Sequence, residues 1–211
     1  MTAPAHRLRW LMISLAFFAT VVNYLDRQTL SVVAPVLLET FHMDSVDYSR
    51  VVSSFLLAYT LMNGVSGALI DRLGTRAGYA ICMLWWSVSS ILHVFATGTL
   101  SLGVFRFLLG MGEAGNWPAA VKVVAEWFPE RERALASGIF NSGATIGVIV
   151  APPVIATIVL RFGWQAAFLL IGMLGFAWLI AWLSIYRTPA DMPTQKRAPQ
   201  PVLQLLRSRF V

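Results

Sequence analysis

The chain has 211 residues, of which 57% are hydrophobic and only 12% are charged, and its formal net charge is +6. Soluble globular domains carry about twice that charged fraction, so the composition excludes a soluble enzyme, a disordered chain and a disulfide scaffold. The mean hydropathy of +0.69 points to a membrane protein. A basic surplus can indicate nucleic-acid binding, but the placement of the charges described below explains it without such a partner.

Stretches long enough to cross a lipid bilayer recur along the chain. About 20 apolar residues span the hydrocarbon core as a helix. We predict an all-α membrane protein with a bundle of six transmembrane helices over residues 10–186. The predicted spans cover residues 10–38, 48–70, 77–97, 100–125, 134–160 and 164–186.

The positions of lysine and arginine predict the orientation of these spans, because basic residues accumulate in cytoplasmic segments. With the N-terminus inside, eleven basic residues fall in inner segments and two, Arg50 and Arg161, fall in outer ones. The inner set comprises Arg7, Arg9, Arg72, Arg76, Arg131, Arg133, Arg187, Lys196, Arg197, Arg207 and Arg209. We therefore expect residues 1–9 to be a cytoplasmic N-terminus and residues 187–211 to be a cytoplasmic linker.

Apart from Arg50 at the outer end of the second span, charged residues inside the predicted spans occur in only two of the six. The first span carries Asp26 and Arg27, and the fourth carries Arg106, Glu113 and Lys122. The spans therefore divide into two triplets whose first helices hold the charges, which is typical of a 3+3 inverted repeat in a transporter. A weaker echo links the sequence Arg-Leu-Gly after span two (72–74) with Arg-Phe-Gly after span five (161–163).

An ionisable side chain at bilayer depth is costly, so by default it marks a pathway or a binding site. Asp26 and Glu113 are candidate proton carriers that Arg106 would influence; the alternative is that these charges form static pairs that only hold helices together. Arg27 offers a planar, permanently charged fork suited to a carboxylate, unless it merely neutralises Asp26. Tyr24 and Tyr59 are candidates for bonds to substrate hydroxyls, with ordinary packing as the alternative.

The loop between spans two and three carries a recognisable motif. Its sequence is Gly67-Ala-Leu-Ile-Asp71-Arg72-Leu-Gly74-Thr-Arg76. It resembles the G-x3-D-R-x-G-x-R signature of the major facilitator superfamily and falls at the expected place. The alternative interpretation is a short turn with basic residues that set topology. The resemblance implies that this turn is a conformational gate that stabilises the outward-open state.

Two further stretches resemble the anion:cation symporter family, and within it the hexuronate and sugar-acid carriers. They are Asn23-Tyr-Leu-Asp-Arg27 and Arg106-x3-Gly110-x-Gly-Glu113-Ala-Gly-Asn-Trp-Pro118. The resemblance covers roughly residues 8–190. It implies a proton-coupled symporter of organic anions, of hexuronate type, that works by alternating access in a bacterial inner membrane.

The same resemblance assigns roles to residues. Arg27 would hold the substrate carboxylate, with Tyr24 and Tyr59 nearby. Asp26 and Glu113 would take part in proton coupling, and Arg106 would link protonation to the conformational change. Asn141 is expected either to face the cavity or to pack. Some family members carry a glutamine a little further along this helix, where this chain has only the small stretch Ser-Gly-Ala (142–144).

The length departs from the family, whose members have twelve spans in two halves with the substrate between them. We expect the chain to be the N-terminal half of a longer carrier, truncated and inactive alone. Its partner would be the missing C-terminal half or a second copy; the alternative function is a half-transporter acting as a non-transporting membrane interaction protein.

An intramembrane enzyme is disfavoured, since His93 is the only histidine in the predicted spans and has no second metal ligand at helical spacing. We therefore predict no enzyme activity, no metal and no cofactor.

Overall fold

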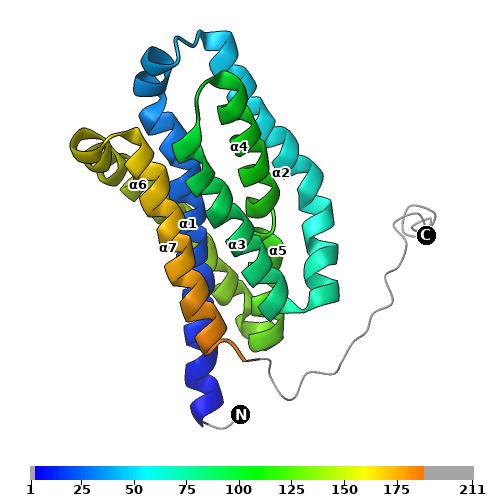
Figure 1. Cartoon of the computed structure of the whole chain (residues 1–211). Coiled ribbons are helices and arrows are strands. Elements are labelled where there is room, and N and C mark those ends of the chain that lie inside the picture. Colours follow the sequence, from blue (N-terminus) through cyan, green and yellow to red (C-terminus); the bar gives the residue numbers. More distant parts are fainter. Residues whose placement is uncertain (1–2, 188–211) are drawn as a thin grey trace, which may run out of the picture.

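The computed structural model describes residues 3–187, with side chains described from Leu8 onward, so most of the expected linker lies outside the described residues. Within this range the chain forms one bundle of α-helices with a single 3-10 turn (Figure 1). The helices are α1 Ala3–Thr40, α2 Ser45–Leu73, α3 Thr75–Leu92, η1 His93–Phe95, α4 Thr99–Glu113, α5 Asn116–Trp127, α6 Glu130–Phe162 and α7 Trp164–Ile185.

Five of the six predicted spans are present as single, long, apolar segments. These are α1, α2, α3 with η1, α6 and α7, each long and apolar enough to cross a membrane. The fourth predicted span is formed instead by two consecutive helices, α4 and α5, which follow one another along the bundle (Figure 1). The interruption falls at Ala114 and Gly115, immediately after Glu113.

A proline, Pro118, is the third residue of α5 and lies just after the interruption. Pro118 has no backbone N–H, and its ring clashes with the carbonyl four residues earlier in a continuous helix. That carbonyl belongs to Ala114, and it accepts a hydrogen bond from Ser66 Oγ of α2 at 3.1 Å. The freed backbone oxygen is thus satisfied by a neighbouring helix, as an irregular backbone at membrane depth requires.

The helix pairing shows the 3+3 inverted repeat. The most extensive contacts join α1 to α6, α2 to α4 and α3 to α7. In span numbers, α1 and α6 are spans one and five, α2 and α4 are spans two and four, and α3 and α7 are spans three and six. Exchanging the first triplet of spans for the second turns the pair one and five into the pair four and two. The pair of spans three and six then maps onto itself. The predicted fold class, an all-α bundle built as two related triplets, is confirmed.

The two turns that leave spans two and five have the same backbone conformation. Gly74 has φ 79° and ψ 159°, and Gly163 has φ 84° and ψ 167°. This region of φ/ψ space is essentially restricted to glycine. The weak sequence echo between residues 72–74 and 161–163 therefore reflects one turn used twice, once at each end of the bundle (Figure 1).

The two ends of the bundle contain different helix ends and different clusters of core residues. At the end near the N-terminus, the start of α1, the α2–α3 turn, the α5–α6 connection and the end of α7 come together (Figure 1). Here the core is rich in stacked aromatic rings, with Trp178 on Trp182 at 5.1 Å and Trp182 on Tyr186 at 4.3 Å. A second apolar cluster, which includes Leu37, Val51 and Trp164, fills the opposite end.

The shared turn conformation gives a test of the fold. We expect Gly74→Ala to lower the free energy of unfolding by about 1–3 kcal/mol, because a Cβ strains this backbone region. Nothing lies within 4 Å of the position of that Cβ, so backbone strain is the cause. Gly138→Ala is the matched control, since Gly138 is helical and equally uncrowded. It should stabilise the protein slightly. Thermal unfolding of the purified protein in detergent measures both, and equal shifts would contradict the assigned conformation.

Candidate functional site

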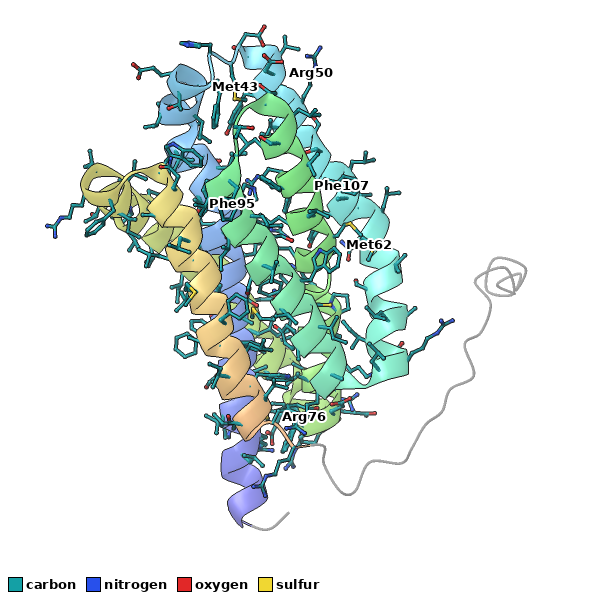
Figure 2. The ribbon with its side chains drawn as sticks, viewed as in Figure 1. Met43, Arg50, Met62, Arg76, Phe95 and Phe107 are labelled. Atoms are coloured by element: carbon teal, nitrogen blue, oxygen red, sulfur yellow. The ribbon has the colours of Figure 1, made fainter. Side chains whose placement is uncertain are left out.

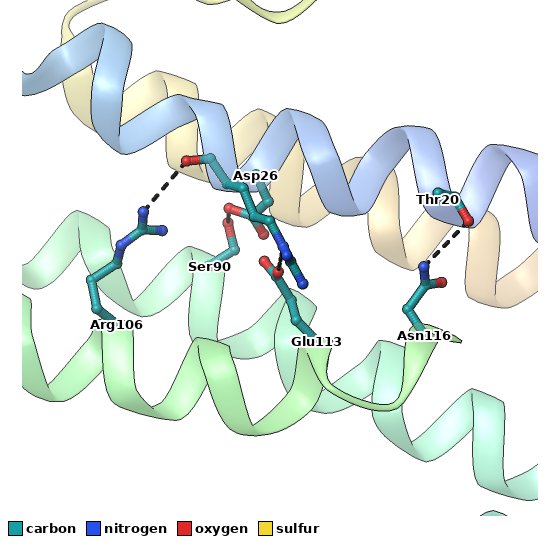
Figure 3. A network of polar contacts seen from close by, with 7 residues as sticks. Thr20, Asp26, Ser90, Arg106, Glu113 and Asn116 are labelled. Atoms are coloured by element: carbon teal, nitrogen blue, oxygen red, sulfur yellow. Dashed lines mark hydrogen bonds and ion pairs between the residues drawn. The ribbon is translucent and has the colours of Figure 1, made fainter. Parts of the chain in front are cut away.

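A buried ion pair joins the first and fourth spans near the middle of the bundle (Figure 3). Arg27 Nε of α1 donates to Glu113 Oε2 of α4 at 2.7 Å. The Glu113 side chain is fully buried, whereas 22% of the Arg27 side chain is exposed. Two residues that are 86 positions apart in the sequence therefore form one site, and the arginine is the member that solvent reaches.

Asp26 belongs to the same cluster but faces a different helix. Successive residues on an α-helix point about 100° apart, so Asp26 and Arg27 cannot share a direction. The fully buried Asp26 accepts a hydrogen bond at Oδ1 from Ser90 Oγ of α3, at 3.0 Å (Figure 3). Ser90 also lies 3.2 Å from the carbonyl oxygen of Phe168 in α7. The carboxylate is thus fixed from α3 instead of being neutralised directly by its neighbour in the chain.

Arg106 lies two turns before Glu113 on α4 and is 4% exposed. Its Nη2 donates a long hydrogen bond of 3.5 Å to the backbone carbonyl of Arg27 (Figure 3). Its guanidinium carbon lies 5.3 Å from the centre of the Phe55 ring. Arg106 therefore contacts the backbone of the residue that pairs with Glu113, and through it the ion pair itself.

Aromatic rings surround the Arg27 guanidinium. Its central carbon lies 4.3 Å from the Tyr59 ring centre, 5.2 Å from that of Tyr24 and 5.4 Å from that of Phe55. A guanidinium this close to ring faces is stabilised by cation–π attraction. The structure thus brings the two predicted tyrosines, from α1 and α2, to the predicted arginine.

Several buried polar atoms of the cluster have no hydrogen-bond partner among the described residues. They are both amide atoms of Asn23, Asp26 Oδ2, Arg27 Nη2, Glu113 Oε1, and Arg106 Nε and Nη1. Each such atom costs about 1–3 kcal/mol, so a group of them requires an explanation beyond packing. The set holds both donors and acceptors, and all of these atoms are buried in this conformation.

Asn141 is not brought to this cluster. Gly143 and Gly147 of α6 lie against Phe17 and Val21 of α1, so the two helices run in the same direction. Asn141 precedes Gly143 by two residues and is exposed. At about 1.5 Å of rise and 3.6 residues per turn, it lies roughly three turns from the level of Arg27.

The predicted gate residues lie at the end of the bundle near the N-terminus. Asp71 pairs with Lys122 of α5 at 2.8 Å, and Lys122 Nζ also donates to the carbonyl of Ile70 at 3.1 Å. Gly67 faces Pro118, whose Cβ lies 3.9 Å from the position that a Cβ on the glycine would take. The motif turn is therefore held against the second half of the broken span.

The two arginines of the motif, Arg72 and Arg76, differ in their contacts. Arg76 Nη2 donates to the carbonyl of Leu183 at 2.6 Å, and Trp182 Nε1 donates to the carbonyl of Arg76 at 3.0 Å. Arg76 is labelled at this end of the bundle in Figure 2. Arg72 is exposed on the last turn of α2. The structure thus ties Arg76 to α7 while Arg72 faces outward.

Sequence reasoning missed three polar residues that hold this architecture. Glu126 of α5 accepts hydrogen bonds from Thr75 and from Tyr186, so it links the motif turn to the end of α7. Burial and the hydrogen bond to Glu126 raise the pKa of Tyr186. Ser90 and Ser66 lie in uncharged spans, where a lone serine gives no signal of its partner.

The five long apolar helices and the family match define an integral, multi-pass membrane protein. The model of the Major Facilitator Superfamily matches residues 16–211, and the chain belongs to this superfamily. Its superfamily motif and its intramembrane charges lie on the spans that the sequence resemblance indicated. The predicted membership is confirmed.

The curated proteins similar to this chain include transporters of sugar acids, which are not enzymes. The chain is 40% identical to the hexuronate transporter of Escherichia coli K12 over 184 residues, which is 87% of this chain and 43% of that protein. It is 39% identical to the galacturonate transporter of Dickeya chrysanthemi, covering 87% of this chain and 53% of that protein. The chain spans about half the length of the curated relatives it matches.

A solved structure supports the fold independently. A bacterial homologue of the human lysosomal transporter Spinster, in an inward-facing and unoccupied conformation, aligns with a TM-score of 0.79 at 21% sequence identity. The alignment covers 96% of this chain and 47% of that one. At this identity the likeness shows the fold alone.

The Arg27–Glu113 pair gives a test of the site's energetics. Removing one member of a buried pair strands the other charge, so we expect Arg27→Gln or Glu113→Gln to cost about 3–5 kcal/mol. The double variant should regain much of that loss. The exposed pair of Asp47 and Arg50, at 3.1 Å, is the control and should show little coupling. Thermal unfolding of the variants measures both cycles, and additive effects at Arg27 and Glu113 would contradict a direct interaction between the two side chains.

Proposed function

We propose that the chain forms half of a carrier that moves a hexuronate or related sugar acid across a bacterial inner membrane together with protons, by alternating access. The observation that carries this proposal is the partly exposed Arg27 at the centre of an otherwise buried charged cluster. The names of the relatives, which are hexuronate and galacturonate transporters, support the substrate class.

Anion binding falls to Arg27. Its Nε is engaged by Glu113, while its Nη2 has no partner among the described residues. A guanidinium suits a carboxylate because its donors form a planar fork. Tyr24 and Tyr59 flank the guanidinium and are placed for the hydroxyls of a sugar acid. Asn141, distant from the cluster in this structure, is proposed as a contact only for a conformation that brings α6 closer to the substrate.

Proton coupling follows from competition for Arg27. While Glu113 is ionised, it occupies the guanidinium that the substrate carboxylate needs. A proton on Glu113 removes that competition, so the proton and the anion bind together, as symport requires. Asp26 is proposed as the second carrier, since its Oδ2 is buried without a partner. Arg106 is proposed to couple the protonation of Glu113 to a movement of α4 through its contact with the Arg27 carbonyl.

The gate is proposed at the motif turn, whose residues are Gly67, Asp71, Arg72, Gly74 and Arg76. Asp71 and Arg76 tie this turn to α5 and α7. We propose that this end is cytoplasmic, with the N-terminus and the C-terminal segment on the same side, because the basic residues of the sequence gather there. The exposed Arg72 is free to contact another part of the carrier.

The second wall of the substrate site is proposed to come from outside the described bundle. A C-terminal half, or a second copy of the chain, would supply it. Of the long apolar helices, α2 and α6 bury the smallest share of their residues. Because the inverted repeat relates these two helices, their exposed faces make a symmetric pair of surfaces for such a partner. A half-carrier that only binds other membrane proteins is the alternative, and it predicts stable co-purification with a partner and no uptake.

Substrate recognition can be tested by uptake. Cells that express the complete reading frame of this gene, in a strain lacking its own hexuronate uptake, should accumulate labelled galacturonate or glucuronate. Arg27→Gln should abolish accumulation because the carboxylate loses its only proposed partner, while Arg50→Gln at the exposed Asp47 pair should leave it unchanged. Immunoblotting checks membrane insertion. Normal accumulation in inserted Arg27→Gln protein would overturn the assignment.

Proton coupling needs a separate experiment. We expect a protonophore to abolish accumulation by the unchanged protein, since the proton gradient drives it. Glu113→Gln, which mimics the protonated side chain, should retain counterflow exchange of labelled for unlabelled substrate and lose accumulation. The exposed Glu39→Gln is the control. Accumulation that persists in Glu113→Gln, or that ignores the protonophore, would contradict the coupling.

A further inference from the structure

The broken fourth span carries the two groups of polar residues on separate helices. Arg106 and Glu113 lie on α4, whereas Lys122 and Glu126, which hold the motif turn, lie on α5. Glu113 is the last residue of α4, so its direction depends on how the chain leaves that helix. A residue that fixes the interruption therefore also fixes the carboxylate.

Asn116, the first residue of α5, makes two side-chain bonds to other helices. Tyr79 of α3 donates its hydroxyl to Asn116 Oδ1 at 2.6 Å. Asn116 Nδ2 donates to Thr20 Oγ1 of α1 at 3.2 Å (Figure 3). All three side chains are fully buried. An asparagine at a helix start commonly caps its own helix, but here both ends of the amide are used to join α1, α3 and α5.

Two close contacts leave the interruption no room to shift. Gly115 packs against α3 so closely that a Cβ there would lie 2.3 Å from Cys82 Sγ. The Tyr79 ring, which supplies the hydroxyl, is itself held by Trp178 and Trp182 with ring centres 5.0 and 5.1 Å away. The chain of hydrogen bonds thus starts from a rigid aromatic cluster and ends on α1, two turns before Arg27.

From these contacts we propose that Asn116 is a positioning residue for Glu113, and that Tyr79 and Thr20 hold it in place. Thr20 and Arg27 lie seven residues apart on α1, so they share one face of that helix. The Asn116–Thr20 bond joins α5 to α1, and the Glu113–Arg27 pair joins α4 to the same face of α1. The two links are three residues apart across the interruption and seven residues apart on α1. The first link sets the register of the second. This inference rests on the proposed function, since the carboxylate that it positions is the proposed proton carrier.

Of the two links to α1, the Glu113–Arg27 pair depends on protonation and the Asn116–Thr20 bond does not. When Glu113 takes up a proton, its attraction to Arg27 weakens and the end of α4 is released from α1. The neutral bonds of Asn116 do not change with that proton, so the start of α5 stays attached to α1 and α3. The interruption then acts as the point about which α4 moves, while α5 keeps its hold on the motif turn.

A matched pair of isosteric substitutions tests this assignment. Thr20→Val removes the hydroxyl that accepts from Asn116. Thr29→Val makes the same change on the same helix at an equally buried residue, whose hydroxyl donates to the carbonyl of Leu25 in its own helix at 2.9 Å. Tyr79→Phe removes the other bond, and Thr20→Ser keeps the acceptor.

Two measurements on the purified, membrane-embedded protein follow. Hydrogen exchange of the backbone amides of residues 113–116 should be about five-fold faster in Thr20→Val and Tyr79→Phe, the factor expected for one buried hydrogen bond. Thr29→Val and Thr20→Ser should match the unchanged protein. In uptake, Thr20→Val should weaken the dependence on external pH, while Thr29→Val should not.

Equal exchange in Thr20→Val and Thr29→Val would overturn the assignment. Faster exchange in Thr20→Val with an unaltered pH dependence would also overturn it, because Asn116 would then be structural only. If the unchanged protein takes up no sugar acid, the proposed function fails, and the exchange experiment still shows whether Asn116 and Thr20 fix the interruption.

Discussion

The structure depends on one constraint, which is that charge placed inside a membrane bundle must find a partner on another helix. An isolated ion costs so much at this depth that each intramembrane charge is rare and is held by specific contacts. Here Arg27 meets Glu113, Asp26 meets Ser90, and Arg106 reaches a backbone carbonyl. These contacts draw α1, α3 and α4 together, so the groups proposed for transport also determine how the helices pack.

The charged cluster also contains hydrogen-bonding atoms without partners among the described residues. A purely structural pair would satisfy every donor and acceptor, because unsatisfied buried groups weaken the fold. In this protein Arg27 is partly exposed and keeps an unused nitrogen, and Glu113 keeps an unused oxygen. These unused atoms are the groups on which the proposed binding of an anion and a proton depends.

Much of the fold could be predicted from the sequence, because apolar length and basic turns follow directly from the physics of the bilayer. Five spans and the repeat emerged in this way, and the pairing of α1 with α6 and α2 with α4 confirms the two triplets. The interruption in the fourth span was harder to predict from the sequence. Pro118 marks a disturbance, but only the position of Ser66 on another helix shows where the backbone is repaired. The sequence does not reveal the partners of Ser90, Glu126 or Asn116, since these depend on what faces each residue across the bundle.

The repeated glycine turn has a consequence for the balance between the two faces of the membrane. Gly74 and Gly163 give both ends of the bundle the same chain reversal. Around Gly74, Asp71 and Arg76 bind neighbouring helices, whereas Arg161 beside Gly163 is exposed. The two turns are therefore alike in backbone conformation and unlike in their side-chain contacts. In the proposed alternating-access cycle, opening at the Gly74 end would require the bonds of Asp71 and Arg76 to break.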